Sequence, residues 1–544
     1  MARARHLLAA VFPWLALWVV CSALFVWTAP GRITYPDDEI VFQTTQSLAE
    51  RGSLEIEGIA RRTGERPGQP SGTFGWAPGR DGERYGFFGH GLSLVAVPVY
   101  WVADATVDRL DPRWRSAIRN DLFVFHQRSP EADWLRMVVS LTNSLLTPLG
   151  AVLLGLWLRE LGHAPRPAVL TALTYALATT AWPYAGTFLS EPLSVIVLLG
   201  AAWAITRWHR DGRPRQLGVA ASLAGLAVHV HVLNVVALPC LVYYALAPTL
   251  GRVGWRGLGS AVDRRSWAIA LGLGALALAM LGLDQWWRYG SPFETGRLGR
   301  YSWWVWPWRG LVTMLFAPGR SLLIYSPPLL LAGLAWPALR RRDPATAWFV
   351  LALALTRLGF VACRSDWHGG WAIGPRYLVP TIPFLLVPLA GWLQRWTEHG
   401  GIHRWLGAGL LGLSVPFQAW LASHSIFQLF WQLNLEHGRD HYRAVADWSF
   451  GAIPPVAFWR LERPALEFAR AGDWPAARLA AQFEALGFGA WRLAKLSDAD
   501  GLWRLLLAIA ALGLVAALGL GVWLVSGLFG RNRAEPVPPS DDRC

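Results

Sequence analysis

Three consecutive carboxylates, Asp37, Asp38 and Glu39, follow Tyr35 and Pro36 just beyond the first long apolar stretch of the chain. A carboxylate in a sheltered place can act as a general base toward a hydroxyl group, or can bind a divalent metal ion. The same pattern suits the start of a helix, because proline is favoured in the first turn and acidic side chains favour the N-terminal end. The sequence therefore predicts an amphipathic helix beginning near Asp37, and both a catalytic and a capping interpretation of its acids remain open.

Glu191, between Ser190 and Pro192, is a second acid at a predicted turn between two apolar stretches. An ionisable side chain at a membrane edge is a functional hypothesis by default, although a charge at a helix N-terminus explains it equally well. His229 and His231 lie two residues apart and so point to different sides of a helix. This spacing disfavours both of them binding one metal ion, and one of them could instead pair with a first-loop carboxylate.

The segment 363 to 377 combines arginines, titratable side chains and glycines, with Arg364, Asp366, His368 and Arg376 as its charged or titratable members. Glycines let a backbone approach a ligand closely, and guanidinium groups bind phosphate oxygens. Arg376 begins an apolar stretch, where an unpaired charge would be costly, so it needs either an acidic side chain or a lipid phosphate as its partner. Arg320, after Gly319, repeats this arrangement at another predicted helix entrance.

The composition excludes a single water-soluble globule. The chain has 544 residues, of which 53% are hydrophobic and 16% charged, and its mean hydropathy is +0.30. The net charge is +14, and nearly all of it is guanidinium because Lys495 is the only lysine. The four cysteines lie far apart in the sequence, which excludes a disulfide scaffold.

Apolar stretches long enough to cross the hydrocarbon core, about 20 residues each, recur along the chain. They predict an all-α polytopic membrane protein with about twelve transmembrane helices. The predicted spans are 7–29, 137–158, 167–184, 187–206, 217–231, 232–249, 267–285, 321–339, 345–363, 376–394, 403–424 and 502–527. The stretch 217–249 could also be one long broken helix, and the run 87–103, with glycines and Pro98, predicts a re-entrant or interfacial element.

Arginines gather in alternate short loops, which predicts that these loops and both termini are cytoplasmic. The long connections 30–136, 286–320, 364–375 and 425–500 then lie outside. Because the short loops account for most of the positive charge, no nucleic-acid partner is expected. We divide the chain into a transmembrane catalytic domain, 1–424, a small outer segment of short helices, 425–500, with an Ala-rich helix at 474–496, and a final span with a cytoplasmic tail, 501–544.

With these residues in place, the chain resembles the GT-C superfamily of integral membrane glycosyltransferases. The similarity is to bacterial relatives of the protein O-mannosyltransferases and of the lipid A aminoarabinose transferase, which are like glycosyltransferase family 39. The resembling motifs are Pro36 to Glu39 with a following stretch that ends at Leu54, Tyr85 to Gly91 with Pro98 and Tyr100, Ser190-Glu191, Ala317 to Pro328, and Gly369 to Pro383. They imply that the long first loop contains juxtamembrane helices.

The resemblance implies an enzyme of a bacterial inner membrane that moves a hexose or pentose, with inversion, from a polyprenyl phosphate to a lipid, glycan or protein acceptor on the outer face. Asp38 is the expected base, Asp37 is its rival, and Glu39 assists or binds metal. Arg376, Arg320 and Arg364 are the expected contacts of the lipid phosphate. Supporting or acceptor-binding roles are expected for Glu191, His90, Asp366 and His368.

A divalent metal ion (Mg, Mn or Zn) is a further hypothesis, with Glu39, His229 and His231 as ligands. The main alternative function is a transporter or flippase of a lipid-linked sugar. Transporters often have internal repeats and ionisable groups at mid-membrane, whereas this sequence shows no repeat and its charged side chains gather at one predicted face.

Overall fold

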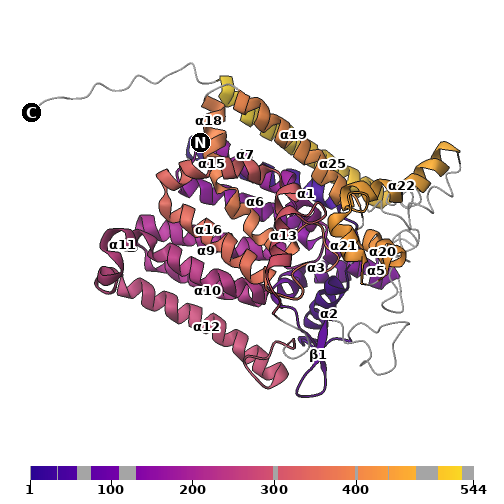
Figure 1. Ribbon diagram of the computed structural model, residues 1–544, viewed down its shortest axis with the longest axis horizontal. Helices are drawn as coiled ribbons and strands as arrows, with labels where there is room; N and C mark the ends of the chain where they lie inside the picture. Colours follow the sequence, from indigo (N-terminus) through magenta and orange to yellow (C-terminus); the bar gives the residue numbers. More distant parts are fainter. Residues whose placement is uncertain are drawn as a thin grey trace, which may run out of the picture.

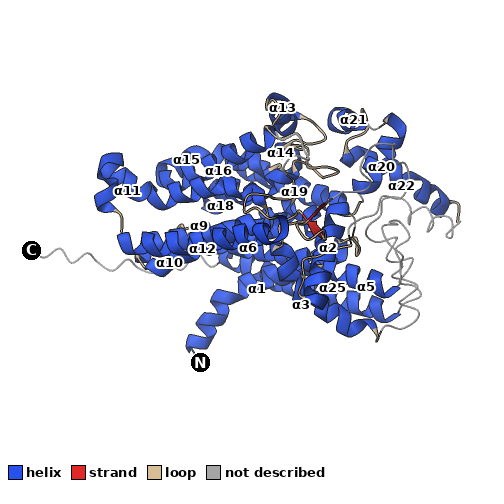
Figure 2. Ribbon diagram, turned by 90° about the horizontal axis from the view of Figure 1, so that it is seen from below, coloured by secondary structure: helices blue, strands red, loops and turns tan. Residues whose placement is uncertain are grey.

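The computed structural model describes residues 2–33, 35–57, 75–109, 130–297, 304–398, 402–424, 426–438, 440–472 and 500–529. Most of this part of the chain is helical, and its only two strands, β1 (Trp76–Pro78) and β2 (Arg84–Gly86), form one short antiparallel hairpin (Figures 1 and 2). The predicted all-α class is therefore confirmed.

Each predicted span coincides with one helix or with a short series of helices. In chain order they are α1 (Ala2–Thr28), α5 (Pro130–Ser140) with α6 (Thr142–Glu160), α7 (Pro165–Ala178) with α8 (Ala181–Ala185), α9 (Glu191–Asp211), α10 (Pro214–Val230), η1 (Val232–Ala237) with α11 (Leu238–Ala261), α12 (Arg264–Tyr289), α14 (Leu322–Tyr325) with α15 (Pro328–Arg342), α16 (Pro344–Ala362), η2 (Arg376–Thr381) with α17 (Ile382–Leu385) and α18 (Val387–Glu398), α19 (Ile402–Ala422), and α25 (Asp500–Phe529).

Six helices of the described residues are long and apolar enough to cross a membrane, or seven if the bent pair 376–385 and 387–395 counts as one span. The chain is thus a multi-pass membrane protein, and the count of about twelve spans stays a prediction. The region 217–249 forms two helices rather than one, because the backbone at His231 is extended, with φ −156° and ψ 123°.

The helices of the bundle lie side by side, with α10 packed between α9 and α12, and α6 against α1, α7 and α9 (Figure 1). The last helix, α25, packs on the first, α1. Leucine and methionine side chains of α12 are exposed, as expected for a surface in contact with lipid.

The two ends of α6 identify the two ends of the bundle. Near its C-terminal end, Arg342 donates to the carbonyl of Leu161 at 3.0 Å, and Arg210 pairs with Glu160. Near its N-terminal end, Asn143 donates to the carbonyls of Thr187 and Leu189. The arginine-rich short loops therefore meet at one end, called the arginine end below. The other end, called the site end, carries the acidic motif of the first loop.

The first loop forms α2 (Pro36–Arg51), as predicted, with Pro36 and three acids in its first turn. It ends at Gly52, whose φ of 63° favours glycine. The apolar run 87–103 forms α3 (Gly91–Val107), a 17-residue helix that packs on α2 and is shorter than the spanning helices. The hairpin is tied to the end of α12, because Arg80 N–H donates to the carbonyl of Arg288 at 2.9 Å.

Four further helices lie outside the predicted spans: α13 (Trp308–Phe316), α20 (Ile426–His437), α21 (Tyr442–Trp448) and α22 (Pro454–Arg470). The short helices expected in 425–500 are thus present up to Arg470. The Ala-rich helix predicted at 474–496 lies outside the described residues. The division into domains and the side of the membrane that each end faces stay predictions.

The predicted topology can be tested by cysteine labelling in a variant whose native cysteines are serine. Ser449 lies just after α21 on the site side, and Ser260 lies near the end of α11 at the arginine end; both are exposed. We expect Ser449→Cys to react with a membrane-impermeant maleimide in intact cells, and Ser260→Cys to react only after the membrane is opened. The reverse pattern would contradict the predicted orientation.

Candidate active site at one end of the bundle

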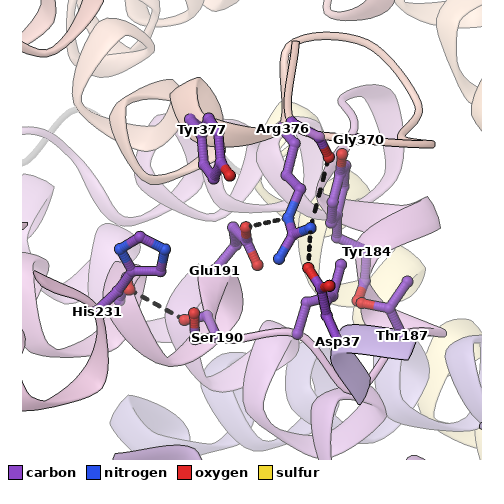
Figure 3. A network of polar contacts seen from close by, with 12 residues as sticks. Asp37, Tyr184, Thr187, Ser190, Glu191, His231, Gly370, Arg376 and Tyr377 are labelled. Carbon is purple, nitrogen blue, oxygen red and sulfur yellow. Dashed lines mark hydrogen bonds and ion pairs between the residues drawn. The ribbon is translucent and has the colours of Figure 1, made fainter. Parts of the chain in front are cut away.

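The centre of the site is a guanidinium held between two carboxylates. Arg376 Nε donates to Glu191 Oε1 at 2.6 Å, and Arg376 Nη1 donates to Asp37 Oδ2 at 2.7 Å (Figure 3). The side chains of Arg376 and Glu191 are 8% and 2% exposed, whereas that of Asp37 is 21% exposed. Asp37 is therefore the acid of this group that a ligand can reach.

Three helix starts bring these groups together. Asp37 lies in the first turn of α2, Glu191 is the first residue of α9, and Arg376 is the first residue of η2. The exposed backbone N–H groups at a helix N-terminus favour negative charge, so both carboxylates lie where the backbone stabilises them. The anionic partner that Arg376 was predicted to need is thus a pair of acidic side chains.

Asp38 lies beside this group but is sealed from solvent. It is 1% exposed, and its Oδ2 accepts a hydrogen bond from Phe188 N–H at 3.2 Å, while its Oδ1 is buried without a partner. Burial, with the nearby Asp37 and Glu191, raises the pKa of Asp38 well above its usual value, against the opposing effects of the Phe188 N–H and Arg376. Asp38 therefore connects α2 to the 187–189 turn, and its burial favours the protonated form of the carboxyl group.

Glu39 points away from the centre. It is 2% exposed and accepts two hydrogen bonds from Arg136 of α5, at 2.7 and 3.0 Å. Gln43 donates to it at 3.1 Å. Glu39 thus joins α2 to α5, and its oxygens are already occupied by this contact.

The two other arginines predicted to bind phosphate also have acidic partners. Arg320 is 1% exposed, and its Nε donates to Asp447 Oδ1 at 2.8 Å. Arg364 makes two hydrogen bonds to Asp366, at 2.6 and 2.7 Å. Burial alone would raise the pKa of Asp366, but the contact with Arg364 outweighs it and the pKa is lowered. Both guanidinium groups are therefore compensated within the protein.

His368 lies next to Arg320 and the exposed Arg443. Its Nε2 is 2.9 Å from Arg443 Nη1, and its Nδ1 accepts from Gly370 N–H. Burial, followed by the charges of Arg443 and Arg320, lowers the pKa of His368 to about 3. The imidazole is neutral at physiological pH.

Three further histidines of the predicted set, His90, His229 and His231, line a small cavity of about 40 Å³ beside the centre. His90 Nε2 lies 2.9 Å from Asp284 Oδ2, and His229 Nε2 lies 2.7 Å from the carbonyl of Ala277. His231 Nδ1 accepts from Leu233 N–H at 3.1 Å. Burial lowers the pKa of His90, although the hydrogen bond to Asp284 opposes it. The predicted pairing of a histidine with a first-loop carboxylate is therefore wrong for the described residues, since each ring has another partner.

Two guanidinium groups also line this cavity, and sequence reasoning missed both. The Nε atoms of Arg288 and Arg297 are buried and have no hydrogen-bond partner. Arg288 pairs with Asp284 at 2.6 Å, but no ion pair with a carboxylate is found for Arg297 among the described side chains. The cavity thus presents unpaired N–H donors and a net positive charge.

The arrangement fits a metal ion poorly. The described residues contain no group of three or more His, Cys, Asp or Glu side chains that could hold one. The positive charge between Asp37 and Glu191 is the guanidinium of Arg376, which takes the place that a metal ion would need. Beside His229 and His231 the positive charge is the guanidinium of Arg297. Metal dependence stays an untested prediction, and no step below uses a metal.

No protein-family model and no curated protein matches the chain. Solved structures similar to it include ArnT from Cupriavidus metallidurans bound to undecaprenyl phosphate, with 17% identity and a TM-score of 0.44, over 89% of this chain and 76% of that one. Another is the oligosaccharyltransferase of Archaeoglobus fulgidus in the apo form, with 13% identity and a TM-score of 0.42, over 79% of this chain and 59% of that one. Scores of this size assign no function.

Removing Arg376 should destabilise the protein strongly, because it leaves Glu191 buried without a partner. We expect Arg376→Met to cost about 3 to 5 kcal/mol and to lower the melting temperature in detergent. Arg376→Met combined with Glu191→Gln should recover part of this loss, because the buried charge is removed with its partner. A double variant as unstable as the single one would contradict this account of the pair.

Proposed function

We propose that the protein is a membrane glycosyltransferase of the GT-C type, which moves a sugar from a polyprenyl phosphate to an acceptor hydroxyl. The observation that carries the proposal is the reachable carboxylate of Asp37, fixed by Arg376 next to a buried cavity with unpaired guanidinium donors. A transfer of this kind needs a base for the acceptor proton and positive charge for the leaving phosphate. Both are present at the site end.

The geometry supports Asp37 as the base better than Asp38, which is the reverse of the order expected from sequence. A base must reach the acceptor and must carry no proton at the start of the reaction. Asp37 is partly exposed and ion-paired, whereas Asp38 is buried and its pKa is raised. In this proposal Asp37 takes the acceptor proton, and the acceptor oxygen displaces the phosphate from the opposite side of the sugar with inversion.

The cavity at Arg297 is the best supported place for the donor phosphate. Arg376, Arg320 and Arg364 each face a carboxylate, so a phosphate would have to compete with it. Arg297 lies over the rings of Phe87 and Phe88 and forms no ion pair among the described side chains, although its charge acts on Asp366. Its Nε and that of Arg288 are buried without a hydrogen-bond acceptor. The His231 ring, which lines this cavity, contacts the ring of Tyr377, the residue after Arg376. A phosphate there would lie next to the centre, where guanidinium groups can stabilise its growing charge.

The finer parts of the function are proposals of the same kind. The donor carries a hexose or a pentose, the acceptor is a lipid, a glycan or a protein, and the site faces the outside of a bacterial inner membrane. A flippase of the lipid-linked sugar would move the same donor without breaking a bond. The charged groups described above gather at one end of the bundle rather than along a path through it, which favours transfer.

The choice of base can be tested with Asp37→Asn and Asp38→Asn, assayed in isolated membranes with polyprenyl-phosphate sugars. We expect Asp37→Asn to lower kcat at least about a hundredfold, because an amide accepts no proton. Asp38→Asn should keep most of the activity, since Asp38 is buried where an acceptor cannot reach it. Full activity in Asp37→Asn would refute Asp37 as the base, and loss of activity confined to Asp38→Asn would restore Asp38 as the base.

The phosphate site can be tested with Arg297→Gln. Loss of a hydrogen bond to a charged group, about 1.5 kcal/mol, should raise KM for the donor roughly tenfold. Arg264→Gln, an exposed arginine at the other end of the bundle, is the matched control and should leave KM unchanged. An unchanged donor KM in Arg297→Gln would rule out this cavity as the phosphate site.

A further inference from the structure

The helix α21 is fixed to the site by buried polar contacts, although it lies beyond the predicted catalytic domain 1–424. Arg320 and Asp447 form an ion pair whose side chains are 1% and 7% exposed. Gly319 N–H donates to the carbonyl of Asp447 at 2.9 Å. A Cβ atom on Gly319 would lie 2.0 Å from the carbonyl oxygen of Ala446, so the two backbones touch where only glycine fits.

The loop 366–375, which leads into Arg376, has hydrogen bonds of its own from Gly369 N–H to the carbonyl of Asp366 and from Gly370 N–H to His368 Nδ1, but it is rich in glycine. Gly369, Gly370 and Gly374 have φ values of 68°, 76° and 60°, which glycine adopts readily. Glycine also loses the most conformational freedom when it is fixed, so such a loop needs contacts from outside to keep one conformation.

Arg320 supplies contacts at both ends of this loop. Its Nη1 donates to the carbonyl of His368 and, at 3.5 Å, to that of Gly374. Arg376 Nη1 lies 3.5 Å from the carbonyl of Gly369 within the same loop. A second tie joins the loop to α21, because Trp371 Nε1 donates to Tyr442 Oη at 2.8 Å.

We propose that Asp447 is a positioning residue of the active site, and that α21 belongs to the catalytic unit. By pairing with Arg320, Asp447 orients the guanidinium that holds the glycine loop, and the loop sets the position of Arg376 and so of Asp37. The inference rests on the proposed function for its kinetic part only. Its structural part, that Asp447 holds the loop 366–375, stands on the contacts alone.

The test uses Asp447→Asn, which keeps the size and one acceptor oxygen but removes the charge, together with Asp447→Glu and Gly319→Ala. The control is Asp440→Asn, which changes an exposed aspartate just before α21. The full-length protein in detergent or vesicles is measured by backbone hydrogen exchange, by melting temperature, and by donor KM and kcat.

We expect faster exchange in 366–375 for Asp447→Asn and Gly319→Ala, with little change in the transmembrane helices. We expect kcat to fall roughly tenfold or more through misplacement of the base, with donor KM changed less, and Asp447→Glu to recover part of it. Unchanged exchange of the loop, or a uniform loss of protection and melting temperature, would overturn the positioning role. A wild-type protein without transferase activity would refute the proposed function instead, and the exchange experiment would still decide the role of Asp447.

Discussion

The burial of Arg376 between Asp37 and Glu191 is the constraint on which the rest of the site depends. A guanidinium that is 8% exposed is stable only with anionic partners, and these come from the starts of two helices far apart in the sequence. The two ion pairs of Arg376 therefore fix α2 of the first loop against α9 and η2 of the bundle. Removing one charge affects the positions of all three elements.

The contacts of the side chains around Arg376 determine which groups are available for chemistry. Burial beside other acids raises the pKa of Asp38, Glu39 is paired with Arg136, and Arg320 and Arg364 are paired with aspartates. Among the described groups of the site, Asp37 remains reachable and Arg297 remains without a carboxylate. The proposed base and phosphate site thus rest on the pattern of pairing, rather than on the number of acids or arginines.

The sequence predicted the elements of the fold better than the contacts within the site. Hydropathy located helices in every predicted span, and the Pro-Asp-Asp-Glu pattern predicted the start of α2, because both signals are local. It also indicated that Arg376 needs an anion, but whether that anion is a side chain or a ligand depends on contacts between distant segments. Arg297 and Asp447 were missed for the same reason. The neighbouring sequence does not distinguish an arginine without an ion pair, or an aspartate that pairs with Arg320, from any other charged residue.

The most direct test of the central claim is the fate of the bond between sugar and phosphate. Purified protein in vesicles is supplied with a polyprenyl phosphate carrying a labelled sugar, together with a membrane extract as the source of acceptors. A transferase releases one polyprenyl phosphate for each labelled sugar that appears in an acceptor, and we predict this result. Intact donor recovered on the opposite leaflet, with no polyprenyl phosphate released, would contradict the account and identify a flippase.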